Sequence, residues 1–173
     1  MRVAISSDGQ TIDQVKIVPT PADFDQGIQT LRQISSELSG GEKIEGTAGG
    51  IAGALDKDHS ILVASPHLKG WVQKPLKKDL ENIFGCRVTL ENDTALNGLG
   101  EAVKGAGLQY SIVAYLGIGT GIGGARIVGQ RIDENSLGFE PGHQVIVADG
   151  NPCDCGGKGH LETYVAGSYI EKT

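Results

Sequence analysis

Two cysteines and two histidines lie close together in a glycine-rich stretch late in the sequence, at His143, Cys153, Cys155 and His160. Two sulfurs and two imidazole nitrogens form a tetrahedral donor set for zinc, and because no position would stay open the ion would be structural. The spacing is not that of a zinc finger, and a surface histidine without a metal is the ordinary alternative. The Cys-x-Cys pair among glycines favours the metal. Cys86 stands apart, so we expect it to be buried and unpaired.

A second stretch, Gly117–Gly124, reads Gly-Ile-Gly-Thr-Gly-Ile-Gly-Gly between two expected strands. Its backbone N–H groups and the Thr120 hydroxyl could surround phosphate oxygens. It is neither a P-loop nor a Rossmann fingerprint, because both of those open a helix, whereas Ile127 and Val128 continue here as a strand. The alternative is a tight glycine hairpin that binds no ligand.

Polar residues also mark the expected junction between a strand and a helix, at Glu91–Asp93. Open α/β sheets place ligands at such strand ends. The Asp93 carboxylate can act there as a general base on a hydroxyl, and Asn92 offers a donor and an acceptor to a neighbouring hydroxyl. The alternative is that Asp93 only caps the helix. Glu162 begins a helix directly after the cysteine-rich loop, so it is either aimed by that loop or simply favoured by the helix dipole.

The elements that must hold these residues follow from hydrophobic periodicity and turn residues. They are a β-hairpin over residues 3–17, helices over 24–38, 72–84, 94–104 and 161–170, strands over 43–55, 61–64, 87–90 and 112–116, and a second hairpin over 122–133. Strands and helices alternate, so the fold class is α/β. Trp71 precedes the second helix, and packing is its ordinary role.

The composition and net charge of the chain argue against several classes of function. The 173 residues carry a net charge of -6 and an isoelectric point near 5.1, which argues against binding to the phosphate backbone of nucleic acid. Apolar residues make up 39%, yet no run is long enough for a transmembrane helix. The N-terminus lacks the sections of a secretory signal. We therefore expect a cytoplasmic protein with no membrane or nucleic-acid partner, and its length suits one domain or a large piece of two.

Six motifs follow one another along almost the whole chain: Gly46–Gly53, Ser65–Trp71, Glu91–Ala95, Gly119–Gly124, Glu140–His143 and Cys153–Gly156. Together they resemble the ROK family of bacterial glucokinases, fructokinases, N-acetylhexosamine kinases and sugar-responsive repressors. The resemblance implies an α/β, actin-like ATPase (RNase H-like) fold with a mixed sheet and flanking helices. Residues 1–115 would form the N-terminal lobe, and residues 116–173 would begin the second. It also implies transfer of the γ-phosphoryl group of ATP, with Mg2+, to a sugar hydroxyl.

The resemblance implies a role for each residue that matches a family motif. Asp93 would be the general base, the sugar ligands would be Asn92, Glu140, His143 and Glu162, and the second phosphate loop would be Gly119, Thr120 and Gly121. Zn2+ would be held by His143, Cys153, Cys155 and His160. His143 would then serve zinc with one ring nitrogen and the sugar with the other. We expect a small-molecule sugar as the partner, with glucose as the first choice, and a homo-oligomer.

Three departures from the family pattern have consequences. His160 stands where the family usually has a third cysteine, which keeps a tetrahedral donor set. His67 stands where the family often has asparagine, which bears on the sugar preference. The family's Asp-x-Gly-Gly-Thr phosphate motif has no counterpart, since Asp8–Thr11 is expected to be only a hairpin turn. We therefore expect a fragment that is not by itself a competent kinase, and the alternative function is the sugar-sensing effector domain of a repressor.

Overall fold

The computed structural model describes residues 1–65, 67–133 and 139–171, so Pro66 of the Ser65–Trp71 motif lies outside the described residues. The chain divides into two compact units, Met1–Asn92 and Asp93–Thr173. Helix α3 (Asp93–Lys104) belongs to the second unit because it packs against the strands that follow it. The kinase lobes expected over residues 1–115 and 116–173 stay a prediction.

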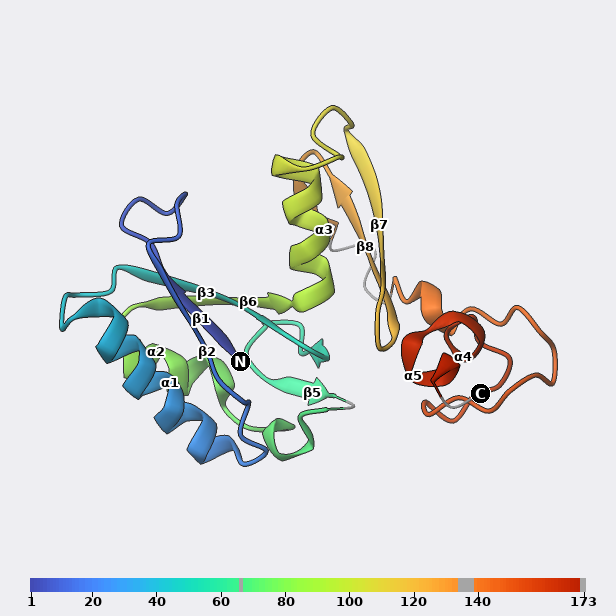
Figure 1. Cartoon of the computed structure of the whole chain (residues 1–173), viewed down its shortest axis with the longest axis horizontal. Helices are drawn as coiled ribbons and strands as arrows, with labels where there is room; N and C mark the ends of the chain where they lie inside the picture. Colours follow the sequence, from blue (N-terminus) through green and yellow to red (C-terminus); the bar gives the residue numbers. More distant parts are fainter. Residues whose placement is uncertain (66, 134–138, 172–173) are drawn as a thin grey trace. The chain divides into compact units, whose positions relative to one another are not determined.

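Unit 1 combines short strands with two helices. Its elements are β1 (Arg2–Ile5), β2 (Gln14–Ile17), α1 (Phe24–Ser39), β3 (Gly46–Ile51), β4 (Ala54–Leu55), β5 (Leu62–Ala64), the 3-10 helix η1 (Lys69–Trp71), α2 (Leu76–Phe84) and β6 (Arg87–Asn92). β1 pairs antiparallel with β2, and β4 with β5, whereas β3 and β6 are parallel and α2 lies in the connection between them. α1 packs on α2 and β1, and α2 packs on β6, so the helices form a layer against the strands (Figure 1).

The α/β class is confirmed, but the single mixed sheet expected from the sequence is not what the described residues form. They form several small sheets, of which β3–β6 is parallel and the others are antiparallel. β1–β2 and β3–β6 remain separate because no ladder hydrogen bonds join β1 to β3 in the described part of the chain. The secondary structure was therefore predicted more accurately than the way in which the strands associate.

Trp71 lies in the core of unit 1 and is only 4% exposed. Its Nε1 donates to the Pro21 carbonyl oxygen at 3.0 Å, and its ring meets Phe24 edge-on with a centroid distance of 5.4 Å. Gly27 of α1 presents bare backbone to the same ring, because a Cβ at this position would overlap the indole. Trp71 therefore has a packing role, and it lies directly against the backbone of α1.

Replacing Gly27 with alanine is expected to destabilise unit 1 by about 1–3 kcal/mol, the usual cost of overpacking a filled core. The new methyl group would occupy the space of the Trp71 ring. Urea unfolding followed by circular dichroism measures the change in the free energy of unfolding. Gly100→Ala in α3 is the matched control, since a Cβ there meets nothing within 4 Å. Equal stability of the two variants would contradict this account of the packing.

Asp8 closes the β1–β2 hairpin. Its Oδ1 accepts hydrogen bonds from Gln10 N and Thr11 N, each at 2.7 Å, and its Oδ2 accepts one from Thr11 Oγ1 at 3.0 Å. The bond from the Thr11 backbone, followed by that from the Gln10 backbone, holds the pKa of Asp8 well below its ordinary value. The stretch Asp8–Thr11 is thus the hairpin turn that the sequence predicted.

We expect Asp8 to stay ionised to a lower pH in the folded chain than in the unfolded chain, where an aspartate titrates with a pKa of about 3.9. Because the pKa is lower in the folded state, the stability contributed by this turn is fully present above the pKa of the unfolded state. It is lost as the pH falls through the folded-state pKa. A 13C NMR titration of the Asp8 carboxyl, with and without urea, measures the difference. Identical midpoints would show that these hydrogen bonds do not form in solution.

Unit 2 is an antiparallel sheet with one long helix, followed by an irregular loop and two short helices. Its elements are α3, β7 (Ile112–Ile118), β8 (Ile122–Val128), β9 (Arg131–Ile132), the 3-10 helix η3 (Pro141–His143), α4 (Glu162–Val165) and α5 (Gly167–Ile170). Ile118 pairs with Ile122, so a three-residue hairpin loop, Gly119–Gly121, joins β7 to β8. The helix predicted over residues 161–170 is instead two single turns, because Ala166 adopts an extended conformation with φ -77° and ψ 146°.

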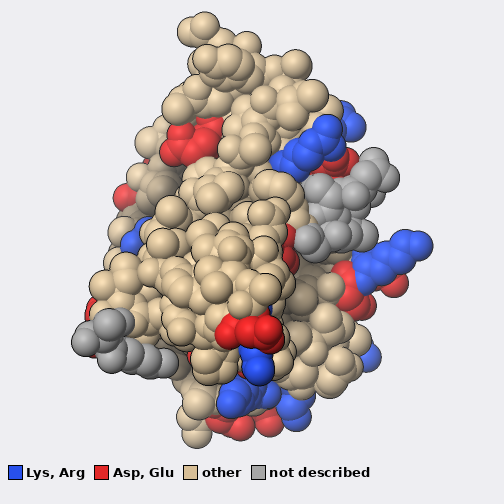
Figure 2. All heavy atoms as spheres, turned by 90° about the vertical axis from the view of Figure 1, so that its right-hand side faces the viewer, with Lys and Arg blue, Asp and Glu red and all other residues tan. Residues whose placement is uncertain are grey.

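None of the described helices is long and apolar enough to cross a membrane. On the face that Figure 2 shows, Lys and Arg atoms lie beside Asp and Glu atoms in small separate groups.

Candidate functional site

The four predicted metal ligands come together in unit 2. The donor atoms of His143, Cys153, Cys155 and His160 all lie within 4.8 Å of one another. His143 Nδ1 is 3.8 Å from Cys153 Sγ, and His160 Nδ1 is 3.4 Å from Cys155 Sγ. Cys153 and His160 are buried, whereas Cys155 is exposed. Two sulfurs and two ring nitrogens gathered in this way fit the tetrahedral coordination of zinc.

Short backbone links fold the loop around this cluster. Cys153 N donates to Gly157 O, and Gly156 N donates to Cys153 O, both at 2.9 Å, which closes a tight turn. Gly156 has a φ of 94°, a value that favours glycine. Leu161 N donates to Gln144 O at 3.0 Å, and this bond brings the chain beside each histidine together. The loop is therefore held by its own backbone hydrogen bonds.

The three cysteines lie in different environments. Burial raises the pKa of the Cys153 thiol in the metal-free chain, and a bound cation would favour the thiolate instead. Cys86 was expected to be buried, but it is only partly buried, and its Sγ lies 3.4 Å from Thr47 Oγ1. Its position between the end of α2 and the start of β6 explains this exposure, because such connections run near the surface.

Glu162, the first residue of α4, holds the glycine hairpin. Its Oε2 accepts a hydrogen bond from Ile122 N at 2.7 Å. A Cβ at position 121 would lie 2.6 Å from the same carboxylate oxygen, so a larger residue there would displace the Glu162 side chain. Gly167 N, at the start of α5, donates to Gly119 O at 2.8 Å. A predicted sugar ligand and the predicted phosphate loop are thus neighbours within unit 2.

Glu140 lies within electrostatic reach of two other predicted sugar ligands. Burial of its carboxyl group raises the pKa of Glu140, although the residue as a whole is exposed. His143 lowers this pKa and the Glu162 carboxylate raises it further. The structure therefore brings Glu140, His143 and Glu162 into one region of unit 2, beside the metal cluster and the glycine hairpin.

Asn92 is the last residue of unit 1 and Asp93 is the first residue of unit 2. The Asn92 side chain donates from Nδ2 to Gly53 O at 3.0 Å. Asp93 is exposed, and its Oδ1 accepts a hydrogen bond from Thr94 N at 2.9 Å. The carboxylate therefore lies at the exposed N-terminal end of α3, where a hydroxyl group can reach it.

Sequence reasoning missed three side chains that hold these residues. His59 Nδ1 lies 3.0 Å from Leu90 O and 3.3 Å from Glu91 Oε2, directly before Asn92 in β6. Tyr164 of α4 and Tyr169 of α5 contact residues 151–160, the metal loop that carries Cys153 and Cys155. No local pattern marks any of the three, because each contact joins residues that are well separated in the sequence.

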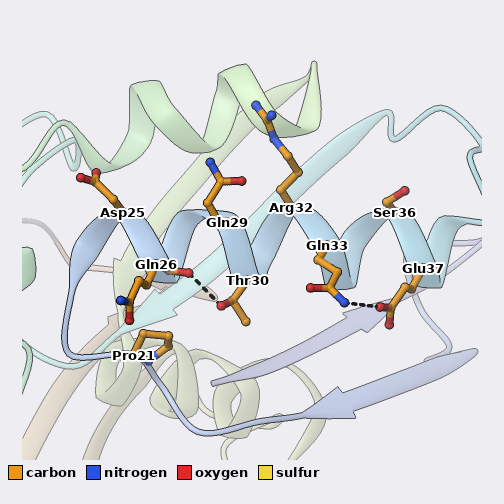
Figure 3. A pocket seen from close by; sticks show the side chains of 9 residues that line it. All are labelled: Pro21, Asp25, Gln26, Gln29, Thr30, Arg32, Gln33, Ser36 and Glu37. Carbon is orange, nitrogen blue, oxygen red and sulfur yellow. Dashed lines mark hydrogen bonds between the residues drawn. The ribbon is translucent and has the colours of Figure 1, made fainter.

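A groove along the outer face of α1 is separate from this site (Figure 3). It is lined by Pro21 and by polar side chains of α1, among which Gln33 Nε2 donates to Glu37 Oε1 at 2.9 Å. None of the predicted site residues lines it. We therefore do not place the candidate site there.

Comparisons relate the chain to known proteins. The ROK family model matches residues 1–173. A glucokinase of Thermotoga maritima is 32% identical over 84% of this chain and 46% of that protein. The crystal structure of a ROK family glucokinase from Streptomyces griseus in complex with glucose and AMPPNP matches with a TM-score of 0.81 and 28% identity, over 99% of this chain and 56% of that one. A putative xylose repressor of Caldicellulosiruptor sp. is 32% identical over 68% of this chain and 30% of that protein. The chain thus spans about half the length of the glucokinases that it matches.

Proposed function

The chain belongs to the ROK family, and from this premise we propose that it acts as an ATP-dependent sugar kinase with an actin-like ATPase fold. It would transfer the γ-phosphoryl group of ATP to a hydroxyl of a hexose, glucose being the first candidate. The proposal rests mainly on the hydrogen bond of 2.7 Å that Ile122 N donates to Glu162 Oε2. This hydrogen bond joins a carboxylate that can bind a sugar hydroxyl to a loop that can bind phosphate.

The sugar would be bound by Asn92, Glu140, His143 and Glu162. Carboxylates, an amide and an imidazole together offer the donors and acceptors that sugar hydroxyls need. Glu162 can keep Oε2 on the hairpin and accept a hydrogen bond from a sugar hydroxyl at Oε1, because a carboxylate has several acceptor positions. Sugar binding and the position of the glycine hairpin would thus depend on one side chain.

Asp93 would be the general base. As its carboxylate takes the proton from the attacking hydroxyl, the sugar oxygen bonds to the γ-phosphorus, the bond to the bridging oxygen breaks, and ADP leaves. The loop of Gly119, Thr120 and Gly121 would face the phosphates, and the backbone N–H groups of Thr120 and Gly121 would stabilise their negative charge. Gly119 N instead donates to Gly121 O at 2.9 Å and holds the shape of the loop. Magnesium bound to ATP supplies further charge neutralisation in reactions of this class.

Zinc would be held by His143, Cys153, Cys155 and His160. Its role there is structural, since four protein ligands leave no position open for a substrate. His143 is the last residue of η3, the helix that follows Glu140, so a ring fixed by the metal would present its other nitrogen toward the sugar. We also keep the homo-oligomer as a prediction.

Titration calorimetry against glucose, N-acetylglucosamine, fructose and xylose, with and without Mg-AMPPNP, tests this proposal. We expect glucose to bind, and ADP formation in a coupled assay reports whether the chain also transfers phosphate. Because the chain spans about half the length of the glucokinases that it matches, a rate far below the usual range of about 1–100 per second is expected. Absence of binding for all four sugars would overturn the proposal.

The second candidate is a sugar-sensing effector domain, which the match to a putative xylose repressor favours. Such a domain would bind a sugar without producing ADP at any measurable rate. Its affinity for the sugar would not depend on nucleotide. Tight binding of xylose without turnover would therefore favour this candidate over the kinase.

A further inference from the structure

Two tyrosines hold the metal loop from the side of α4 and α5. Tyr164 Oη accepts a hydrogen bond from Asn151 N at 3.0 Å. Tyr169 Oη accepts one from Asp154 N at 3.1 Å and donates to Cys153 Sγ at 3.9 Å. Both hydroxyls thus contact the backbone on either side of Cys153, and one of them also contacts the sulfur itself.

The same two helices also contact the glycine hairpin. Glu162 of α4 accepts from Ile122 N at 2.7 Å. Gly167 N and Ser168 N of α5 donate to Gly119 O and Thr120 O at 2.8 and 3.2 Å. The hairpin and the metal loop are therefore tied to one pair of helices.

These helices are too short to keep their geometry unaided. α4 and α5 contain four residues each, with the extended Ala166 between them. An isolated helix shorter than about 12 residues is marginal in water, so contacts with the rest of the protein must supply the order of such single turns. A change that weakens the contacts of α4 and α5 with the metal loop should therefore also weaken their contacts with the glycine hairpin.

We propose that Tyr164 and Tyr169 are positioning residues that couple the metal loop to the glycine hairpin through α4 and α5. A filled metal site fixes Asn151–Cys155, the tyrosines then fix the two helices, and Glu162 and the start of α5 fix the hairpin. The inference rests on the proposed zinc site and on the proposed phosphate role of the hairpin. The link itself consists only of contacts within unit 2. The hydrogen bond from Tyr169 to Cys153 Sγ also supports the metal ligand directly, as outer contacts of metal sites commonly do.

Hydrogen exchange of the peptide over residues 117–124 tests the coupling, with the chain either loaded with zinc or stripped by EDTA. In the unsubstituted chain we expect EDTA to speed exchange in this peptide by about tenfold, the effect of losing roughly one net hydrogen bond. Tyr164→Phe/Tyr169→Phe with zinc bound should exchange as fast as the stripped chain. Tyr110→Phe, at a residue that is 67% exposed, is the control and should behave like the unsubstituted chain.

A purely structural role would give a different pattern. General loosening would speed exchange over residues 95–104 of α3 as well, whereas we expect that peptide to be unchanged. If the double variant binds less than one equivalent of zinc, the hairpin exchange of the single variant Tyr164→Phe tests the coupling instead, because Tyr164 contacts Asn151 rather than a metal ligand. Hairpin exchange that is indifferent to zinc, or to Tyr164→Phe with zinc bound, overturns the coupling. The measurement needs no sugar or nucleotide, so its failure is distinct from failure of the kinase proposal.

Discussion

Replacing Cys153 with serine is expected to lower the affinity for zinc by more than about 100-fold, the upper range for losing even an outer contact of a metal site. Cys153 is buried and its Sγ lies 3.8 Å from His143 Nδ1, so no water can easily take its place. The loop should also lose order, because metal binding and folding of such a loop are coupled. Competition with a chelator of known affinity measures the first effect. Hydrogen exchange of the peptide over residues 151–160 measures the second.

Cys86→Ser is the matched control for this experiment. Cys86 is a partly buried thiol of unit 1 beside Thr47, and its loss removes the same chemical group without touching the cluster. We expect this variant to keep a full equivalent of zinc. Equal zinc content in the Cys153 and Cys86 variants, or its absence from the unsubstituted chain, would show that the cluster is not a zinc site.

The structural elements that the sequence predicted best are those that depend on residues close together in the sequence. α1 begins after Asp23, whose side chain accepts from Gln26 N, and it ends at Gly40 with a φ of 60°, as the Asp and the Gly pair in the sequence indicate. The gathering of His143, Cys153, Cys155 and His160 was predictable for a similar reason, because the first and the last of them are only 17 residues apart. The glycine hairpin was predictable because its residues are consecutive.

The parts that the sequence did not predict depend on distant contacts. Glu162 lies 40 residues from Ile122, and nothing near either residue indicates that the carboxylate holds the hairpin. The break at Ala166 is also set from outside, since the next residue, Gly167, donates its N–H to Gly119 O in the hairpin. The helical periodicity of residues 161–170 predicts a continuous helix, but it contains no information on the hydrogen bond from Gly167 N to the hairpin. The packing of Trp71 against Gly27 likewise joins two segments that sequence analysis treated separately.

Replacing Asp93 with asparagine is expected to reduce whatever phosphoryl transfer the chain supports by about 10²- to 10⁴-fold, the usual contribution of a general base. The fold should survive, because asparagine keeps the oxygen that accepts from Thr94 N at 2.9 Å. It loses only the negative charge, which contributes at most about 1 kcal/mol at a helix N-terminus. Sugar affinity should change little, since binding needs a polar partner and only proton transfer needs a base. Coupled measurement of ADP formation and titration with glucose separate the two effects.

Asp25→Asn supplies the control for charge, because Asp25 is the acidic residue in the first turn of α1, as Asp93 is in that of α3. Both substitutions remove one carboxylate from a helix N-terminus, so any effect of net charge or helix dipole is common to them. Only the Asp93 variant should lose turnover. Turnover that stays unchanged there would exclude Asp93 as the base. A parallel loss in both variants would point to stability instead of proton transfer, and the melting temperatures of the two proteins would then identify the cause.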